Sequence, residues 1–272
     1  MIRGDGPRRW PPGNLRARLS AAFLLGVAIL AILAPLVAGH SPTQQNAMPF
    51  SEMSADHWLG TDDLGRDVWA RLVYGARASL LAAFVAVVVG VGIGVPIGLV
   101  SGFYGGWTDA ILMRIADAFL SFPGIILAIA ITAVLGSGLL HAMVAVGIVF
   151  SPSIARLMRG QVLVTKERGY VEAASTFGSP SWWIVVRHIL PNAIQPVVIQ
   201  ATFMLGLAVL AEASLSFVGL GVQYPNPSFG VMLRSAAQFT AIDPMGVYPP
   251  GLAIALLVLA FNALGDSLRD IL

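Results

Sequence analysis

The long uncharged runs of this chain constrain its fold more than any other feature. Residues 19–51, 78–108 and 118–155 contain no Asp, Glu, Lys or Arg. A run of about 18 apolar residues is long enough to cross a lipid bilayer as a helix. Overall, 57% of the residues are hydrophobic and 11% are charged, whereas soluble domains carry about 25% charged residues. The sequence therefore predicts a membrane protein with several spans.

The predicted fold class is all-α, a polytopic bundle of six transmembrane helices. Lipid offers no partner to the backbone polar groups, which favours helices, and no segment alternates like a barrel strand. The predicted spans are residues 19–37, 78–103, 110–135, 139–154, 193–218 and 247–264. We expect two parts, residues 1–77 with a tail, the first span and an outer loop, and residues 78–272 with five more spans.

The distribution of basic residues predicts the orientation, because Lys and Arg favour the cytoplasmic side. With the N-terminus inside, twelve of the 16 basic residues lie on the inner side, so both termini are predicted to be cytoplasmic. The arginines before residues 19–37 imitate a secretory signal, but this stretch exceeds the usual apolar region of about 7–15 residues. We expect it to remain in the membrane as an anchor.

The largest predicted cytoplasmic loop, residues 156–192, carries the stretch EAASTFGSPSWWIVVRHILPN at 172–192. An amphipathic period over residues 167–177 predicts a short helix. Its apolar face is expected to consist of Tyr170, Val171, Ala174 and Phe177. Gly178 follows the last periodic residue, where a left-handed C-cap is expected.

A second short helix is predicted to follow at once. Ser179 suits its N-cap and Pro180 its first position, and the helix is expected to end at Pro191. The pattern alone leaves two interpretations open. The segment is either an interfacial helix, with Trp182 and Trp183 at the lipid headgroups, or a docking element for another protein.

The amino-acid sequence of this loop resembles the signature loop of ATP-binding-cassette (ABC) importer permeases. The shared features are EAA at 172–174, Gly178, and HILP at 188–191. The broad consensus has an aliphatic residue where His188 stands, but the dipeptide, oligopeptide and nickel permease branch commonly has histidine. Further stretches similar to that branch are HWLGTDDLGRDVWARLVYGARASL at 57–80, DAILMRIADAFLSFPGIILAI at 109–129, AEASLSFVGLGV at 211–222 and FNALGDSLRDIL at 261–272.

The resemblance implies a type I ABC importer permease fold, in which the loop is a coupling helix that sits in a groove of a cytoplasmic ATPase subunit. The residues it implies for this coupling are Glu172, Ala173, Ala174, Phe177, Gly178, His188, Leu190 and Pro191. It also implies a second, related permease, two ATPase subunits that bind ATP and Mg, and an extracytoplasmic solute-binding protein. The implied location is the bacterial plasma membrane, where the chain contacts lipid. Separately, the formal net charge of +2 is too small to suggest nucleic-acid binding.

The implied function is ATP-driven import of dipeptides or oligopeptides by alternating access. Nickel-chelate import, secondary transport and a purely structural role are the alternatives. Secondary transport would need ion ligands on broken helices. Lys166 stands between Thr165 and Glu167, which excludes a phosphate-binding loop around it. We therefore expect a non-catalytic chain that binds no cofactor of its own.

Charged residues near the predicted spans suggest two structural features. Glu212 is acidic and lies well inside a span, so it must face the bundle or a wet cavity. It either lines the pathway or outer gate, or anchors the adjoining SLSFVGLG turn by hydrogen bonds. Arg114 and Asp117 are spaced to form an ion pair on one helix at the inner interface, with Asp109 nearby.

Glycines recur every four residues along the second span, which permits close approach of another helix. These residues are Gly90, Gly94, Gly98 and Gly102. The sequence leaves open whether the neighbouring helix belongs to this chain or to a partner.

No metal site is predicted. The acidic pair in GTDDLGRD at 60–67 lacks the ligand spacing of an EF-hand and is interpreted as a capped outer turn. The histidines are expected to be scattered without forming a metal cluster. They are His40, His57, His141 and His188. The chain has no cysteine, which removes thiolate ligands as well.

Overall fold

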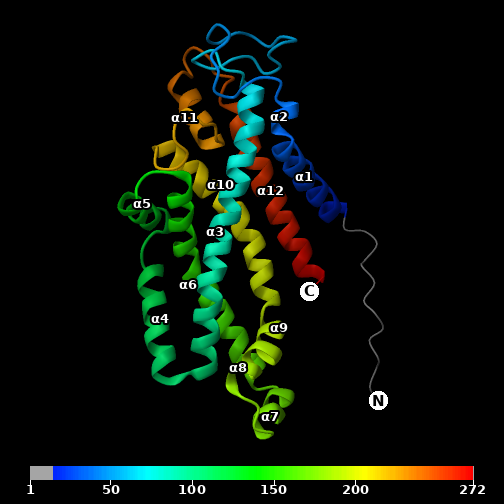
Figure 1. Ribbon diagram of the computed structural model, residues 1–272, viewed down its shortest axis with the longest axis vertical. Helices are drawn as coiled ribbons and strands as arrows, with labels where there is room; N and C mark the ends of the chain where they lie inside the picture. Colours follow the sequence, from blue (N-terminus) through cyan, green and yellow to red (C-terminus); the bar gives the residue numbers. More distant parts are fainter. Residues whose placement is uncertain (1–14, 272) are drawn as a thin grey trace.

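The computed structural model describes residues 15–271, which form an elongated helical molecule (Figure 1). Arg3, Arg8 and Arg9, which contribute to the predicted orientation, lie outside the described residues. The elements are α1 (Leu15–Ile32), α2 (Ala34–Val37), α3 (Val68–Tyr104), α4 (Gly106–Leu120), α5 (Gly124–Leu135), α6 (Leu139–Lys166), α7 (Gly169–Thr176), α8 (Ser181–Ile184), η1 (Val185–Ile189), α9 (Leu190–Ala193), α10 (Gln195–Val218), α11 (Phe229–Gln238) and α12 (Tyr248–Ile271). The predicted all-α class is confirmed.

Five helices, namely α1, α3, α6, α10 and α12, are long and apolar enough to cross a membrane, and α4 with α5 makes a sixth span if the bent pair counts as one. The prediction of a single helix over residues 110–135 is wrong, because α4 and α5 are bent by 96°. Pro123 stands at the break. Proline lacks an N–H and disfavours a helical residue before it, which ends α4. The turn predicted at 136–138 is confirmed, with positive φ at both of its glycines.

Two helices are longer than the predicted spans 78–103 and 139–154. The 37 residues of α3 extend over about 55 Å at 1.5 Å per residue, and a hydrocarbon core is only about 30 Å thick. Asp67 sets the start of α3, since its carboxylate accepts a hydrogen bond from the Ala70 N–H at 2.6 Å. Hydropathy marks the lipid-facing part of a helix, whereas capping groups decide where the helix begins.

The predicted glycine ladder packs α3 against α6 of the same chain. A Cβ added at Gly94 would lie 2.6 Å from the Ser151 carbonyl oxygen, and one at Gly98 would lie 2.5 Å from that of Ala155. On α6, a Cβ at Gly147 would lie 2.6 Å from the Val89 Cβ. These distances are too short for any side chain. The question left open by the sequence is thereby answered, since the neighbour is intramolecular.

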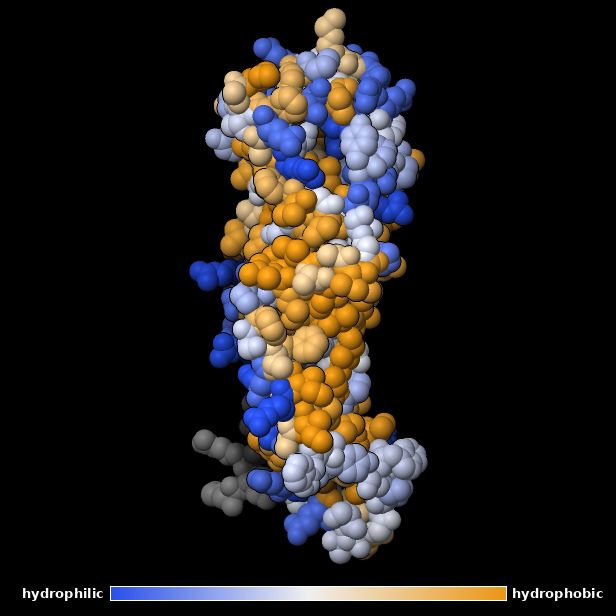
Figure 2. Space-filling model, turned by 90° about the vertical axis from the view of Figure 1, so that its left-hand side faces the viewer, coloured by the Kyte–Doolittle hydropathy of each residue, from blue (hydrophilic) through white to orange (hydrophobic). Residues whose placement is uncertain are grey.

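The surface matches a membrane-embedded bundle. Figure 2 shows apolar side chains over the middle of the molecule and polar ones concentrated toward its ends. Large apolar side chains on the outside of the bundle include Leu25, Phe84 and Leu256, which are 62%, 62% and 49% exposed. The loop between α2 and α3, which is the predicted outer loop, lies with α11 at one end of the molecule, and the segment α7–α9 lies at the other (Figure 1).

Candidate functional site

The loop singled out by the sequence forms a compact pair of helical turns at one end of the molecule (Figure 1). Helix α7 ends at Thr176, and Gly178 adopts a left-handed φ of 78°. The Gly178 N–H donates to the Ser175 carbonyl at 3.0 Å, and the Ser179 N–H donates to that of Ala174 at 3.1 Å. This is a Schellman cap, in which glycine avoids the Cβ strain of a positive φ. The predicted C-cap at Gly178 is confirmed.

The second half of the loop differs from the prediction in detail. Pro180, not Ser179, is the N-cap of α8. The helix does not end at Pro191, because a π-helical turn over Val185–Ile189 leads into α9. In an α-helix the proline ring would clash with the carbonyl four residues earlier. The wider π turn just before Pro191 relieves this clash, so the chain continues into α10.

Side chains of the loop divide between an inward and an outward surface. Val171 and Ile184 are each 4% exposed and pack in a core cluster that includes α6 residues. Phe177 and Trp182 point away from the chain and are 88% and 67% exposed. The predicted apolar face is therefore only half correct, because Phe177 is free of the chain's own core. The loop therefore packs against the helix bundle through Val171 and Ile184, and exposes aromatic side chains on its opposite surface.

The other residues implied for coupling lie on the same loop. Glu172, Ala173, Gly178 and Pro191 are exposed, while Ala174, His188 and Leu190 are partly buried. The His188 ring packs edge-on against Trp183, with 4.8 Å between ring centroids. His188 thus contacts another side chain of the loop, while Phe177 and Trp182 are the more exposed groups.

Two ion pairs join α4 to α6. Asp109 receives both the Nε and the Nη2 hydrogen bonds of Arg159, each at 2.5 Å. Asp117 pairs with Arg156, which comes from α6. The predicted pair between Arg114 and Asp117 is therefore wrong. The spacing along one helix permits that pair, but the neighbouring helix places another arginine against the carboxylate.

Glu212 is fully buried and both of its carboxylate oxygens are hydrogen-bonded. The Ser79 hydroxyl on α3 donates to Oε2 at 2.8 Å, and the Ser216 hydroxyl on α10 donates to Oε1 at 2.7 Å. The Ser216 oxygen in turn accepts from the Val222 N–H at 3.0 Å. This chain of contacts ties two helices to the SLSFVGLG turn. The geometry favours the anchoring role over a role in lining the pathway.

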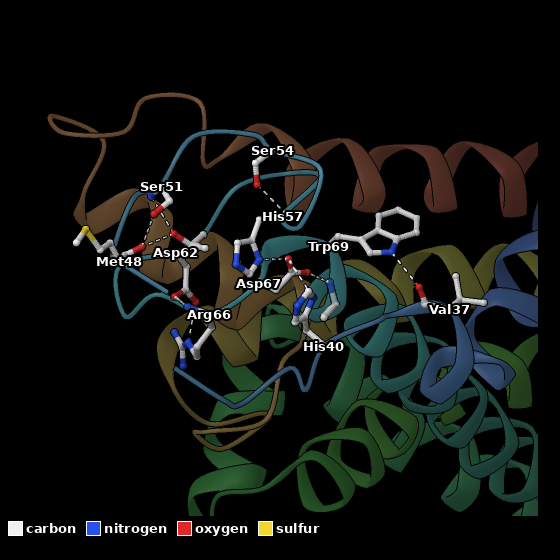
Figure 3. Close-up of polar contacts among 12 residues, drawn as sticks. Val37, His40, Met48, Ser51, Ser54, His57, Asp62, Arg66, Asp67 and Trp69 are labelled. Carbon is white, nitrogen blue, oxygen red and sulfur yellow. Dashed lines mark hydrogen bonds and ion pairs between the residues drawn. The ribbon is translucent and has the colours of Figure 1, made fainter. Parts of the chain in front are cut away.

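The acidic pair of the outer loop is engaged by arginines. Asp62 accepts from the N–H groups of Leu64 and Arg66, each at 3.0 Å, and so caps the turn. Its Oδ2 also lies 2.7 Å from the Arg66 Nε and 3.2 Å from the Arg71 Nε. Figure 3 shows the Asp62–Arg66 contact. These contacts match the predicted capped turn.

Two of the four histidines meet in the same outer loop, so the prediction that they are scattered is wrong for this pair. His57 Nδ1 lies 2.8 Å and His40 Nδ1 lies 4.0 Å from Oδ2 of Asp67. The two imidazole rings are 4.9 Å apart between centroids. Figure 3 shows the Asp67 carboxylate between them. The two histidines are 17 residues apart in the sequence and their spacing gave no sign that they meet.

A family model described as the binding-protein-dependent transport system inner membrane component matches residues 94–272. The chain belongs to this family. The match covers the loop with Gly178 and the buried Glu212. The outer loop with His40, His57 and Asp67 precedes the matched residues.

Relatives and solved structures agree with this assignment. A dipeptide transport system permease protein of Alkalihalophilus pseudofirmus is 43% identical over 262 residues, covering 95% of this chain and 86% of the relative. A glutathione transport system permease protein of Pectobacterium atrosepticum is 48% identical over 219 residues, or 80% and 73% of the two chains. A structure of inward-facing conformations of the MetNI methionine ABC transporter matches with a TM-score of 0.60 and 26% identity, over 75% of this chain and 97% of that chain. This inner membrane component is thus a permease of an ABC importer.

Proposed function

We propose that this permease imports peptides, and that the loop around α7 and α8 transmits motion to it from an ATPase subunit. The peptide class is supported by the relatives, whose names specify dipeptide and glutathione transport. Glutathione is itself a tripeptide, so one chemical class covers both names. Nickel chelates and proton-driven transport have no comparable support.

The observation that carries the coupling role is the two-sided loop. Its inward side chains, Val171 and Ile184, are buried against the bundle, and its outward side chains, Phe177 and Trp182, are largely exposed. A capped element that is anchored on a packed core transmits a rigid-body displacement, which a mobile loop would absorb. Aromatic side chains are enriched at protein interfaces, and tryptophan is enriched among the residues that contribute most of the binding energy.

Membership of the family supports a proposal for the remaining assembly. A second permease would complete the pathway, two ATPase subunits would bind ATP and Mg, and an extracytoplasmic binding protein would deliver the peptide. In this arrangement both termini face the cytoplasm and the loop of His40 and Asp67 faces outward. The chain itself forms half of the pathway and carries out no chemical step.

Uptake of a radiolabelled dipeptide into vesicles that contain the whole complex tests the substrate class. We expect uptake only with ATP inside, and uptake driven by a proton gradient without ATP would contradict an ABC mechanism. The cysteine-free chain also allows single cysteines to be introduced one at a time. A cysteine at Phe177 should cross-link to the ATPase subunit, whereas a cysteine at Val171, which is buried, should not.

A further inference from the structure

The strongest unassigned feature is the cluster of His40, His57 and Asp67 in the outer loop. One ligand atom from each residue lies within 4.8 Å of the other two. The side chains are 33%, 14% and 2% exposed in that order, so the cluster is sheltered but reachable from one side. Two imidazoles and a carboxylate are the donors that zinc and similar divalent transition metals bind. We propose that these three residues form a zinc-type metal site.

The carboxylate of Asp67 is divided between two roles. Its Oδ1 accepts the Ala70 N–H at 2.6 Å and caps α3. Its Oδ2 faces both imidazoles, with the nearer Nδ1 at 2.8 Å and the farther at 4.0 Å. Ligands around tetrahedral zinc lie about 3.3 Å apart when the bonds are 2.0–2.1 Å long. The two separations lie on either side of that value, so small side-chain rotations bring both nitrogens to a shared ion.

The backbone around the cluster is held in place before any ion binds. The Trp69 Nε1 donates to the Val37 carbonyl at 3.3 Å, which ties the end of α2 to the start of α3 just before His40. The His57 N–H donates to the Ser54 hydroxyl at 3.0 Å, and the Ser54 N–H donates to the His57 carbonyl at 2.9 Å. Figure 3 shows the Trp69–Val37 contact and the contact of the Ser54 hydroxyl beside the three candidate ligands. Such support lowers the cost of ordering the ligands.

Space for a fourth ligand adjoins the cluster. A cavity of about 220 Å³ is lined by His40, Asp67 and Asp56 among others. This volume admits a water molecule, which would complete a tetrahedral site. On binding, the metal would take the place of the hydrogen on His57 Nδ1, and the proton would pass through solvent to Nε2, so the imidazole stays neutral. The bound ion would link His40 and His57 of this loop to Asp67, the N-cap residue of α3.

Zinc binding to the purified full-length chain, in its complex and without a polyhistidine tag, tests the site. The measurement is a competition titration against a chromophoric chelator, followed by Co²⁺ absorption as a probe of tetrahedral geometry. The decisive variant is His40→Ala, which keeps the His57–Asp67 hydrogen bond and the cap of α3. His141→Ala is the matched control, because it removes an imidazole from another part of the chain. With no cysteine present, thiolates cannot contribute to either signal.

We expect one zinc ion per chain. His40→Ala should weaken binding at least about tenfold, since even second-shell substitutions cost 10–100-fold in metal affinity. His141→Ala should leave affinity and the Co²⁺ spectrum unchanged, and zinc should raise the melting temperature of the wild type but not of His40→Ala. If His40→Ala is not recovered as a folded complex, His57→Gln takes its place. Absence of saturable binding, or equal affinity in the ligand variant and the control, overturns the proposal.

Discussion

Replacing Gly98 by alanine should destabilise the permease, whereas the same replacement at Gly92 on the same helix should not. A Cβ at Gly98 would lie 2.5 Å from the backbone oxygen of Ala155 and 2.6 Å from the Met158 Cβ, while a Cβ at Gly92 would meet nothing within 4 Å. Backbone atoms cannot rotate away, so α3 and α6 must separate. Ordinary contact begins at 3.4 Å, which requires a shift of about 0.9 Å.

The size of the effect follows from that displacement. A gap of 0.5–1 Å forfeits about a quarter to a half of the dispersion energy of each contact along the interface. Overpacking of this kind costs about 1–3 kcal/mol. Glycine to alanine in a helix gains roughly 1 kcal/mol by propensity, and this gain is common to both variants. The difference between the variants should therefore be about 2 kcal/mol, or roughly 4–8 °C in melting temperature.

The assay is the apparent melting temperature of the purified complex, recorded by fluorescence at one heating rate, because large membrane assemblies unfold irreversibly. The Gly98→Ala complex should melt below the wild type and Gly92→Ala at or above it. Equal melting temperatures for the two variants would show that α3 and α6 do not pack through the glycine ladder as described.

Three other predictions concern the loop, the topology and the buried carboxylate. Gly178→Val should leave the protein inserted but abolish peptide uptake, because a β-branched residue resists the φ of 78°; normal uptake would refute the coupling role of the loop. Single cysteines at Ser54 and Ser175 should react with impermeant reagents from opposite sides of the membrane, and labelling from one side would overturn the proposed orientation. Glu212→Leu should lower complex yield and melting temperature more than Glu212→Gln, since Gln keeps an acceptor for the serine hydroxyls. A Glu212→Leu complex of wild-type stability but altered uptake would instead place this residue on the pathway.

Local signals were sufficient for much of the fold and for part of the site. The uncharged runs predicted the spans, because the cost of placing charge in lipid is set by each segment alone. The cap at Gly178 and the turn at 136–138 could also be predicted, because they too depend on local residues. A positive φ is a property of one residue, and glycine adopts it without strain.

Contacts between distant segments could not be read from spacing. Arg114 and Asp117 have the i, i+3 spacing that allows an ion pair on one helix. Asp117 nevertheless pairs with Arg156, because the packing of α6 against α4 brings that arginine to the carboxylate. The glycine ladder showed that a helix must approach, but only the fold identified that helix as α6. The same limit applies to Glu212, whose Ser79 partner stands 133 positions away in sequence.

The sequence by itself determined that this protein is an all-α membrane bundle with a capped loop at one end. Only the tertiary structure decided that Phe177 points away from the core and that His40, His57 and Asp67 share one corner of the outer loop. The physical reason is the range of the interactions. Hydropathy and capping act within a few residues, whereas the surroundings of a side chain depend on which helices pack together and on how far each is rotated about its axis.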